Sequence, residues 1–392
     1  MHYTPVIASR LAHTYSSGYW KVANRCFFNK AECFRFASEI QNYDGISYHF
    51  FDEIYTAIDW TVDPVQSLDS MYADRAKQIR EKYKYVCLMF SGGCDSTNML
   101  KAFLKNNIHI DEIFTVYPIK AIEKLNSNFN INDKSSENLI FEYNETVVPT
   151  FEYLAKHYPN IKLTVIDYTT DAIDFILQGK LHSLFLSGTV VSPYTVGWFK
   201  AYEKIHALDK DACLVFGVDK PRLAYNKKKD KFKSYFSDFN NIFGHWPRST
   251  FGTPRVSTEL FYYSPSMPLI PIKQCKQIEQ GLRQVLDSTH PLHNQVFKDR
   301  KEIKIVDVHH DYVKSLLYPD WNTKLYQAKK QSSIFFAEQT KWVSNISGSL
   351  FDDFYNGQLN EIIHGISPKL IEYDNLGRPS KLKEMSSSFN II

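Results

Sequence analysis

Long hydrophobic runs are missing from this chain of 392 residues. No stretch approaches the roughly 20 consecutive apolar residues that a membrane-spanning helix needs. The first residues, Met1 to Pro5, also lack the basic region followed by an apolar one that marks a signal peptide. We therefore expect a soluble, cytoplasmic protein that has no membrane partner.

Paired cysteines and a strong net charge are missing as well. The 6 cysteines are scattered and form no C-x-x-C pair, which argues against a zinc ribbon or a cysteine-ligated cluster. Lysine and arginine total 46 against 43 acidic residues, so the net charge of +3 does not suggest a basic coat for nucleic acid. Hydrophobic residues make up 44% of the chain, which is enough for a packed core.

Short apolar runs alternate with helix-like stretches through the first half of the chain. The predicted strands are residues 85–90, 112–117, 162–167, 181–186 and 213–216. The predicted helices are residues 28–41, 67–84, 97–105, 147–157 and 196–207. This alternation predicts an α/β fold with a parallel, twisted sheet that has helices on both faces. The carboxyl ends of the strands then share one edge, where ligands of such sheets bind.

Four regions are expected from the changes in composition along the chain. Residues 1–66 are an aromatic-rich segment, and residues 67–225 form the α/β domain. Residues 226–271 are expected to be a loop region, first lysine-rich and then rich in proline and aromatic residues. Residues 272–392 are expected to be mostly helical. The best helix candidates there are residues 272–286 and 325–344, and the tail 381–392 is expected to be frayed.

A turn rich in glycine and hydroxyl groups, Ser91 to Ser96, directly follows the predicted strand 85–90. Its glycines, Gly92 and Gly93, let the backbone turn sharply and approach a ligand closely. The next helix directs its first N–H groups at the turn and the serines add hydroxyl donors, so the turn suits a phosphate. Asp95 would repel that phosphate unless a Mg²⁺ ion bridges the two groups. The turn therefore predicts a site for a polyphosphate and Mg²⁺.

Two common phosphate-binding motifs do not account for this turn, because the chain has neither G-x-x-x-x-G-K-[ST] nor G-x-G-x-x-G. Instead, FSGGCDS at residues 90–96 resembles the SGGxDS signature of the PP-loop ATP pyrophosphatase superfamily, in which it also follows a strand and precedes a helix. The resemblance covers about residues 67–225. It implies an adenine nucleotide α-hydrolase-like fold, ATP and Mg²⁺ as cofactors, and cleavage of ATP to AMP and pyrophosphate.

Within that superfamily, the synthetase domain of asparagine synthetase looks most similar. Its Gly-x-Gly-x-Asp-Glu turn resembles VFGVDKPRL at residues 215–223, although Val215 replaces the first glycine and Lys220 the glutamate. An acidic residue near the start of a helix in that family is matched by Glu142 or Glu145. The nucleotide-binding residues that the resemblance implies are Ser91, Gly92, Gly93, Asp95, Ser96 and Gly217. The implied Mg²⁺ ligands are Asp95 and Asp219, and the implied catalytic residues are Asp95, Asp219 and Lys220.

The implied reaction is that of an AMP-forming ligase, similar to an amidotransferase. A carboxylate or amide oxygen would be adenylated and its carbon then attacked by a nitrogen nucleophile. Glutamine-dependent asparagine synthetase begins with a catalytic cysteine after the first methionine, whereas His2 stands at that place here. The stretch before residue 85 is also too short for a glutaminase domain. Ammonia, an amine or a separate partner is therefore expected to supply the nitrogen.

Two other functions stay open on the sequence alone. A nucleobase- or tRNA-modifying enzyme of the same superfamily, thiolating enzymes included, would bind nucleic acid through the lysines of residues 227–233, although such a run is more commonly a solvated loop. The second open function is a module that binds a nucleotide without catalysing a reaction, and such a module would also keep the loop at residues 91–96. No motif tells whether the acceptor is a small molecule, a protein or a nucleic acid.

Further candidate residues lie outside the loop. Asp167 ends a predicted strand at the same sheet edge and suits either a ligand or a helix cap. Arg222 lies close to the second turn and is a candidate phosphate contact, and Trp198 suits either a substrate pocket or the core. His309 and His310 are adjacent and would point in different directions on a helix, so we expect no shared metal.

Overall fold

A computed structural model describes the chain over most of its N-terminal two thirds and over parts of the remainder. The described residues are 18–27, 29–120, 142–178, 194–208, 211–218, 220–226, 228–238, 256–286, 289–291, 293, 303–305, 311–318, 357, 360–373, 377 and 379–391. No helix within these ranges is long and apolar enough to cross a membrane.

The main sheet has five strands, all parallel, in the order β10-β7-β4-β5-β6. Its strands are β4 (Tyr85–Met89), β5 (Glu112–Tyr117), β6 (Lys162–Asp167), β7 (Ala212–Phe216) and β10 (Val256–Leu260). The central strand β4 is almost fully apolar and buried, as expected for a parallel strand covered on both faces. The predicted parallel α/β sheet is thus confirmed.

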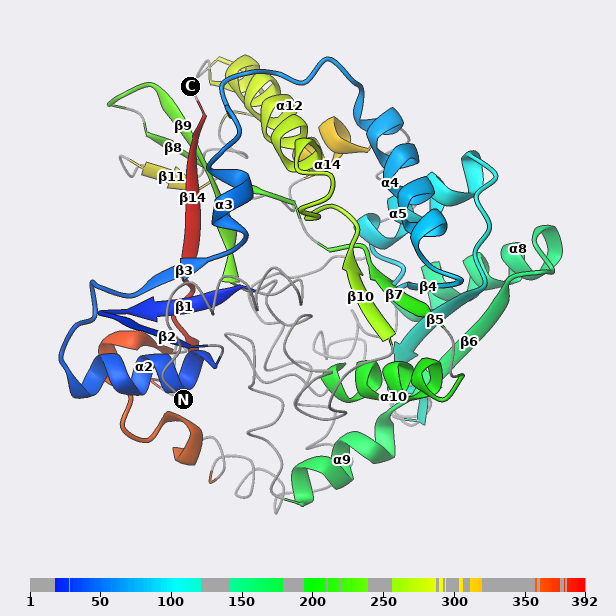
Figure 1. The fold of residues 1–392 in the computed structure, drawn as a ribbon, viewed down its shortest axis with the longest axis horizontal. Coiled ribbons are helices and arrows are strands. Elements are labelled where there is room, and N and C mark those ends of the chain that lie inside the picture. Colours follow the sequence, from blue (N-terminus) through cyan, green and yellow to red (C-terminus); the bar gives the residue numbers. More distant parts are fainter. Residues whose placement is uncertain are drawn as a thin grey trace.

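Helices cover both faces of this sheet, as predicted (Figure 1). One side carries α4 (Leu68–Lys82), α5 (Cys94–Lys105) and α8 (Val148–His157), the last preceded by a π-helical turn, η1 (Glu142–Val147). The other side carries α10 (Tyr194–His206), which packs on β5 and β6, and α9 (Thr169–Leu177) beside it. Each helix that the alternation predicted is present within a few residues of its expected ends.

The chain changes direction across the sheet at β4. From β4 it moves outward through β5 to β6, and it then returns to the opposite side of β4 as β7. The connections that leave the carboxyl ends of β4 and β7 therefore run in opposite directions, which makes this place the topological switch point of the sheet. Ligands of open α/β sheets bind at such points.

The edge strand beyond β7 differs from the sequence-based expectation. It is β10, which lies within residues 226–271, where we expected only loops, and residues 181–186 lie outside the described part of the chain. The sequence of β10, VSTEL, has no apolar run and contains the charged residue Glu259. Its carboxylate is buried because Arg75 and Lys82 hold it at 2.7 Å and 2.8 Å, contacts that the strand's own sequence does not reveal.

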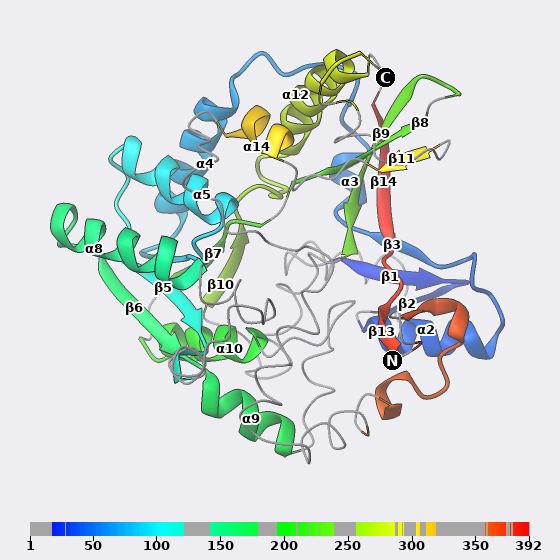
Figure 2. The same cartoon turned by 180° about the vertical axis from the view of Figure 1, so that it is seen from behind.

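A second, antiparallel sheet has the order β11-β8-β9-β14 and lies on the opposite side of the molecule from β6 and α8 (Figure 2). Its strands are β8 (Arg222–Asn226), β9 (Lys231–Ser237), β11 (Ile303–Ile305) and β14 (Ser386–Ile391). The expectation of a loop at 231–237 is wrong, because Phe232 and Phe236 point inward while Lys231 and Lys233 face solvent. The expectation of a frayed tail is also wrong, since β14 pairs with β9 along its length.

The remaining elements flank these two sheets. Near the N-terminus, β1 (Tyr19–Val22), β2 (Arg25–Phe27) and β3 (Ser47–His49) form an antiparallel sheet beside α2 (Lys30–Glu39) and α3 (Asp52–Tyr55). Toward the C-terminus lie α12 (Leu269–Val285) and α14 (Asp311–Leu317), the predicted helical part, with η4 (Pro368–Leu370), β12 (Ile371–Tyr373) and β13 (Pro379–Leu382). Four of the strands in this half, β11 to β14, were not expected. The predicted helix at 325–344 lies outside the described residues.

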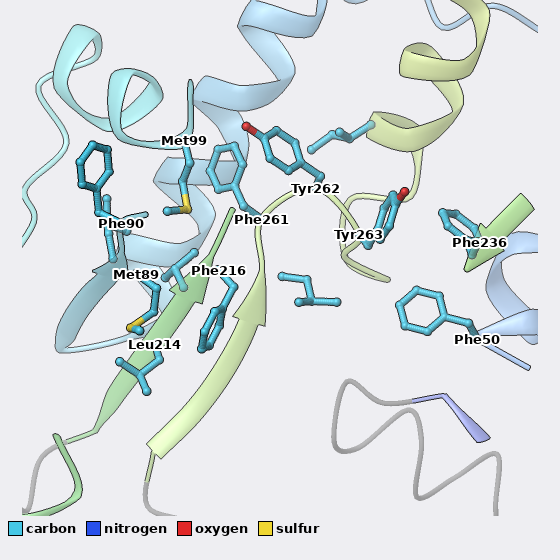
Figure 3. Close-up of a cluster of buried hydrophobic side chains, with 14 of the residues drawn as sticks. Phe50, Met89, Phe90, Met99, Leu214, Phe216, Phe236, Phe261, Tyr262 and Tyr263 are labelled. Atoms are coloured by element: carbon cyan, nitrogen blue, oxygen red, sulfur yellow. The ribbon is translucent and has the colours of Figure 1, made fainter. Parts of the chain in front are cut away.

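Aromatic side chains join these units into one core. Figure 3 shows Met89, Leu214 and Phe216 on the central strands, and Phe261 and Tyr262 beyond the end of β10. Phe50 and Phe236 have ring centroids 5.6 Å apart, and Phe236 and Tyr263 are 4.7 Å apart. The N-terminal segment, the second sheet and the end of β10 are therefore packed against one another through a continuous set of rings.

Candidate functional site

The turn after β4 has the geometry that its glycines require. Gly92 has φ +76°, a left-handed conformation that glycine adopts without strain, and a Cβ atom there would lie 3.0 Å from Val147 Cγ2. Gly93 is the N-cap residue of α5, and no side chain caps this helix end by a hydrogen bond. The first N–H groups of a 12-residue helix thus face the turn, where the helix dipole favours an anion.

Two serine hydroxyls stand together at this helix end. Ser91 Oγ lies 3.2 Å from Ser96 Oγ, and Ser96 Oγ donates to the carbonyl oxygen of Gly93 at 3.0 Å. From the end of the neighbouring strand β5, the hydroxyl of Tyr117 donates to the carbonyl oxygen of Ser91 at 2.7 Å. The hydroxyls are therefore held in place by the turn itself and by the sheet edge.

The turn after β7 contacts the turn after β4 directly. A Cβ atom at Gly217 would lie 2.9 Å from Ser96 Cα and 3.0 Å from the carbonyl oxygen of Asp95. Such distances leave no room for a side chain, so Gly217 lets the two turns meet backbone to backbone. The rule that parallel strands end at a common edge of the sheet predicts this closeness, and the role of Gly217 in binding a nucleotide stays a prediction.

Lys220 and Asp95 form an ion pair across the two turns. Lys220 Nζ lies 2.6 Å from Asp95 Oδ1 and 2.8 Å from Asp95 Oδ2. The lysine side chain is fully buried, whereas that of Asp95 keeps 20% of its surface exposed. An ammonium, a carboxylate and the positive end of α5 thus meet at the switch point of the sheet.

Two tyrosines from later in the chain donate hydrogen bonds to Asp95. The hydroxyl of Tyr318, the residue after α14, donates to Asp95 Oδ1. The hydroxyl of Tyr262, just beyond β10, donates to the carbonyl oxygen of Asp95 at 2.8 Å and accepts from Asn98 Nδ2 at 3.0 Å. Burial and, secondarily, the Asp95 charge raise the pKa of Tyr318 well above its ordinary value, so this hydroxyl keeps its proton and donates.

These residues suit a phosphate group and one divalent cation. The helix end, the serine hydroxyls and the Lys220 ammonium all favour an anion. No cluster of three or more His, Cys, Asp or Glu side chains with metal-binding geometry occurs within the described ranges. Mg²⁺ is usually held by one or two carboxylates together with substrate phosphates and water, and Asp95 provides one such carboxylate. The donor set therefore fits a Mg²⁺ ion that arrives with a polyphosphate.

Several predicted residues are placed outside this site. Asp167 caps the start of α9, because its Oδ1 accepts from Thr169 N at 2.9 Å and from Thr169 Oγ1 at 2.6 Å. Arg222 donates to Glu384 Oε1 at 2.6 Å, next to the C-terminal strand. Trp198 packs edge-on against Phe216, with ring centroids 6.0 Å apart. Of the two alternatives weighed for Asp167 and Trp198, the structure thus supports the cap and the core.

Other predictions fall where the structure gives no placement. Asp219, Lys227, His309 and His310 lie outside the described residues, and nothing is described of the side chain of Glu142. Glu145 is exposed on η1. The role of Asp219 as a second Mg²⁺ ligand therefore stays a prediction.

Sequence reasoning missed three tyrosines of the site. Tyr117 and Tyr262 stand at the carboxyl ends of β5 and β10, the edge at which a parallel sheet binds its ligands, and this position was the available signal. Tyr318 has no comparable signal, since it is 223 residues away from Asp95 along the chain.

Comparisons with known proteins add a similarity to solved structures. No protein-family model matches the chain, and a search of curated proteins found no match either. A search of solved structures found an NH3-dependent NAD synthetase from Campylobacter jejuni subsp. jejuni NCTC 11168, in complex with the nitrate ion. The match has 12% sequence identity and a TM-score of 0.25, and it covers 69% of this chain and 96% of that one. At these values it says nothing about the activity of this chain.

Proposed function

We propose that this protein is an ATP-dependent, AMP-forming ligase that binds the phosphates of ATP at the start of α5. The observation that carries the proposal is the buried Lys220 ammonium, paired with Asp95 at the N-terminus of α5 and at the switch point of the sheet. A buried cation at an anion-favouring helix end suits a group that carries several negative charges. The resemblance of residues 90–96 to the SGGxDS signature supports ATP as the source of that group.

Each residue of the turn has a role in this proposal. The N–H groups of the first turn of α5 and the hydroxyls of Ser91 and Ser96 would bind phosphate oxygens. Lys220 would stabilise the negative charge that grows on the departing pyrophosphate. Asp95, with Asp219 as a second candidate, would hold Mg²⁺, which supplies further neutralisation of the phosphate charge when it is bound.

The chemistry follows the resemblance to asparagine synthetase. An oxygen of the acceptor's carboxylate or amide would attack the α-phosphorus, and the bond from that phosphorus to the bridging oxygen of pyrophosphate would break. A nitrogen nucleophile would then attack the activated carbon, and AMP would leave with the acceptor's oxygen. The protein's contribution is to align the phosphates for in-line attack and to stabilise the leaving group.

Product analysis tests this proposal. The protein is incubated with ATP, Mg²⁺ and fractions of a cell extract, and the products are identified by mass spectrometry. AMP and pyrophosphate are expected, in amounts that fall with Lys220→Met. The matched control is Lys200→Met, which removes another ion-paired lysine, 2.5 Å from Asp171 on the α10 side of the sheet. Release of ADP and phosphate would contradict the proposal, and tight ATP binding without any cleavage would favour a non-catalytic module.

One observation favours a second candidate, a nucleic-acid-modifying enzyme. Lys229, Lys231 and Lys233 are exposed on the β8–β9 hairpin, which begins two residues after Lys220. A phosphate backbone bound along these lysines would enter the site from this hairpin. RNA or DNA binding that weakens steeply as salt rises, and that is lost when the three lysines are replaced by serine, would support this acceptor class. If neither RNA nor DNA binds at low salt, this second candidate function is contradicted.

A further inference from the structure

We propose that Tyr318 is a positioning residue of the nucleotide site, which makes the C-terminal part of the chain a component of that site. The inference rests on the proposed function, since it assigns a role in binding ATP and its cation. Its basis is a set of contacts among Tyr318, Asp95 and Lys220.

Tyr318 contacts both members of the ion pair. Its hydroxyl donates to Asp95 Oδ1, the same oxygen that accepts from Lys220 Nζ at 2.6 Å. The ammonium of Lys220 also lies 5.7 Å from the centroid of the Tyr318 ring, within the range of a cation–π interaction. One side chain thus fixes the orientation of the carboxylate and stabilises the position of the ammonium.

Helix packing, and not a loop, determines where Tyr318 lies. Tyr318 N donates to the carbonyl oxygen of Lys314, which continues the hydrogen-bonding pattern of α14. Along α14, the hydroxyl of Tyr312 donates to the carbonyl oxygen of Gly281 at 2.9 Å. A Cβ atom at Gly281 would lie 2.4 Å from Leu316 Cδ1, so this glycine lets α12 and α14 approach closely. A side chain fixed by packed helices holds a site more accurately than one on a free loop.

Tyr318 and Tyr262 together restrain Asp95 on two sides. Tyr262 holds its backbone carbonyl oxygen, and Tyr318 holds its carboxylate. The carboxylate is therefore presented in one orientation when a cation and phosphates arrive. Without the Tyr318 hydroxyl, the carboxylate would lose one of the hydrogen bonds that fix its orientation. We expect weaker binding of the cation–nucleotide complex as the result.

The experiment compares Tyr318→Phe with Tyr312→Phe. Both changes remove one tyrosine hydroxyl from the same segment, but only the first touches Asp95. Binding of Mn²⁺ together with ATP is measured by electron paramagnetic resonance on the full chain, and the melting temperature of each variant is recorded. We expect Tyr318→Phe to raise the dissociation constant of the Mn²⁺–ATP complex about ten-fold. Tyr312→Phe is expected to leave it within about two-fold of the unaltered protein.

A spectroscopic measurement on the unaltered protein complements the variants. Addition of Mg²⁺ and ATP should change the near-ultraviolet absorption of tyrosine, and this difference should shrink in Tyr318→Phe but not in Tyr312→Phe. Equal Mn²⁺–ATP affinities for the two variants, or no tyrosine difference in the unaltered protein, would overturn the inference and leave the proposed function intact. If the unaltered protein does not bind Mn²⁺ with ATP, the proposed function fails and the inference fails with it.

Discussion

Among the described residues, two lysine–aspartate pairs have a fully buried lysine, and the surroundings of the two pairs differ. Lys30 Nζ and Asp238 Oδ2 are 2.5 Å apart with both side chains fully buried, and Trp20 Nε1 donates to the same carboxylate oxygen at 2.8 Å. Lys220 and Asp95 are equally close, but Asp95 is partly exposed and stands at the open end of α5. The first pair joins the N-terminal segment to the end of β9, whereas the second lies at the switch point of the main sheet. The sealed pair is placed to stabilise the fold, and the open pair is the one to which the proposed function assigns ATP binding.

The largest expected effect is on stability, at the sealed pair. Lys30→Met leaves the Asp238 carboxylate buried without its cation, which should lower the free energy of unfolding by about 3–5 kcal/mol in a urea titration. The double change of Lys30→Met with Asp238→Leu removes both charges and should restore most of that loss. ATP cleavage per folded molecule should stay unchanged, and a drop in that activity would contradict the division between the two pairs.

The second expected effect is on activity, at the open pair. Lys220→Met should reduce pyrophosphate release by about 100-fold or more, because it removes a cation from the developing charge of the leaving group. The loss of stability should be smaller than for Lys30→Met, since Asp95 retains contact with solvent and with Tyr318. Release rates and urea midpoints measured on both variants check this ordering. Equal losses of unfolding free energy in Lys220→Met and Lys30→Met would contradict the distinction between the open and the sealed pair.

The third effect concerns the contact between the two turns of the site. Gly217→Ala places a Cβ atom 2.9 Å from Ser96 Cα, a backbone atom that cannot move aside cheaply. We expect a loss of about 1–3 kcal/mol in unfolding free energy together with weaker ATP binding. Gly357→Ala is the matched control, because a Cβ atom there meets nothing within 4 Å. Isothermal titration with ATP, combined with thermal unfolding, separates the two variants.

The smallest expected effect is a difference in the rate of thiol labelling between two cysteines, one near each lysine–aspartate pair. Cys33 lies on α2 near Lys30, and burial raises its pKa to about 12, so at pH 8 it stays protonated and unreactive. Its thiolate, and with it the reaction, should appear only as the pH approaches that value. Cys94 adjoins Asp95 and is partly exposed.

Labelling with iodoacetamide at pH 8, followed by peptide mass spectrometry, should therefore find Cys94 and not Cys33. ATP with Mg²⁺ should slow the labelling of Cys94 a few-fold, because the nucleotide would cover the start of α5. Protection of Cys33 instead of Cys94 would place the nucleotide elsewhere in the molecule.

The sequence predicts strands β4 to β7 of the main sheet, but it does not predict β10 or the strands of the second sheet. The strands β5 and β6 match the prediction at both ends, because both are rich in apolar and β-branched residues. The glycine turn and α5 followed from local chemistry that needs no distant partner. In contrast, β10 contains Glu259, whose burial depends on Arg75 and Lys82 on another element. The lysine content of β9 predicts a loop, but the structure has a strand whose inward residues alternate with those lysines.

The part of the candidate site that lies in the two turns was predictable from the sequence, and the part that comes from the C-terminal helices was not. Ser91, Gly92, Gly93, Asp95 and Ser96 could be predicted because all of them belong to one turn. The Gly217 turn could be brought beside them by the rule that parallel strands end at a common edge. The position of Tyr318 depends on how α14 packs on α12, which no local pattern records.

The position of β4 at the middle of the sheet has a consequence for synthesis on the ribosome. Its partner β5 follows soon after it, but its other partner, β7, begins at Ala212, and the contact from Tyr318 comes later still. A nascent chain that ends shortly after Asp167 therefore holds one half of the sheet, with the edge of β4 and its glycine turn uncovered. Such a chain exposes an unpaired strand edge during translation, and the contacts of Lys220 and Tyr318 with Asp95 form only among the last events of folding.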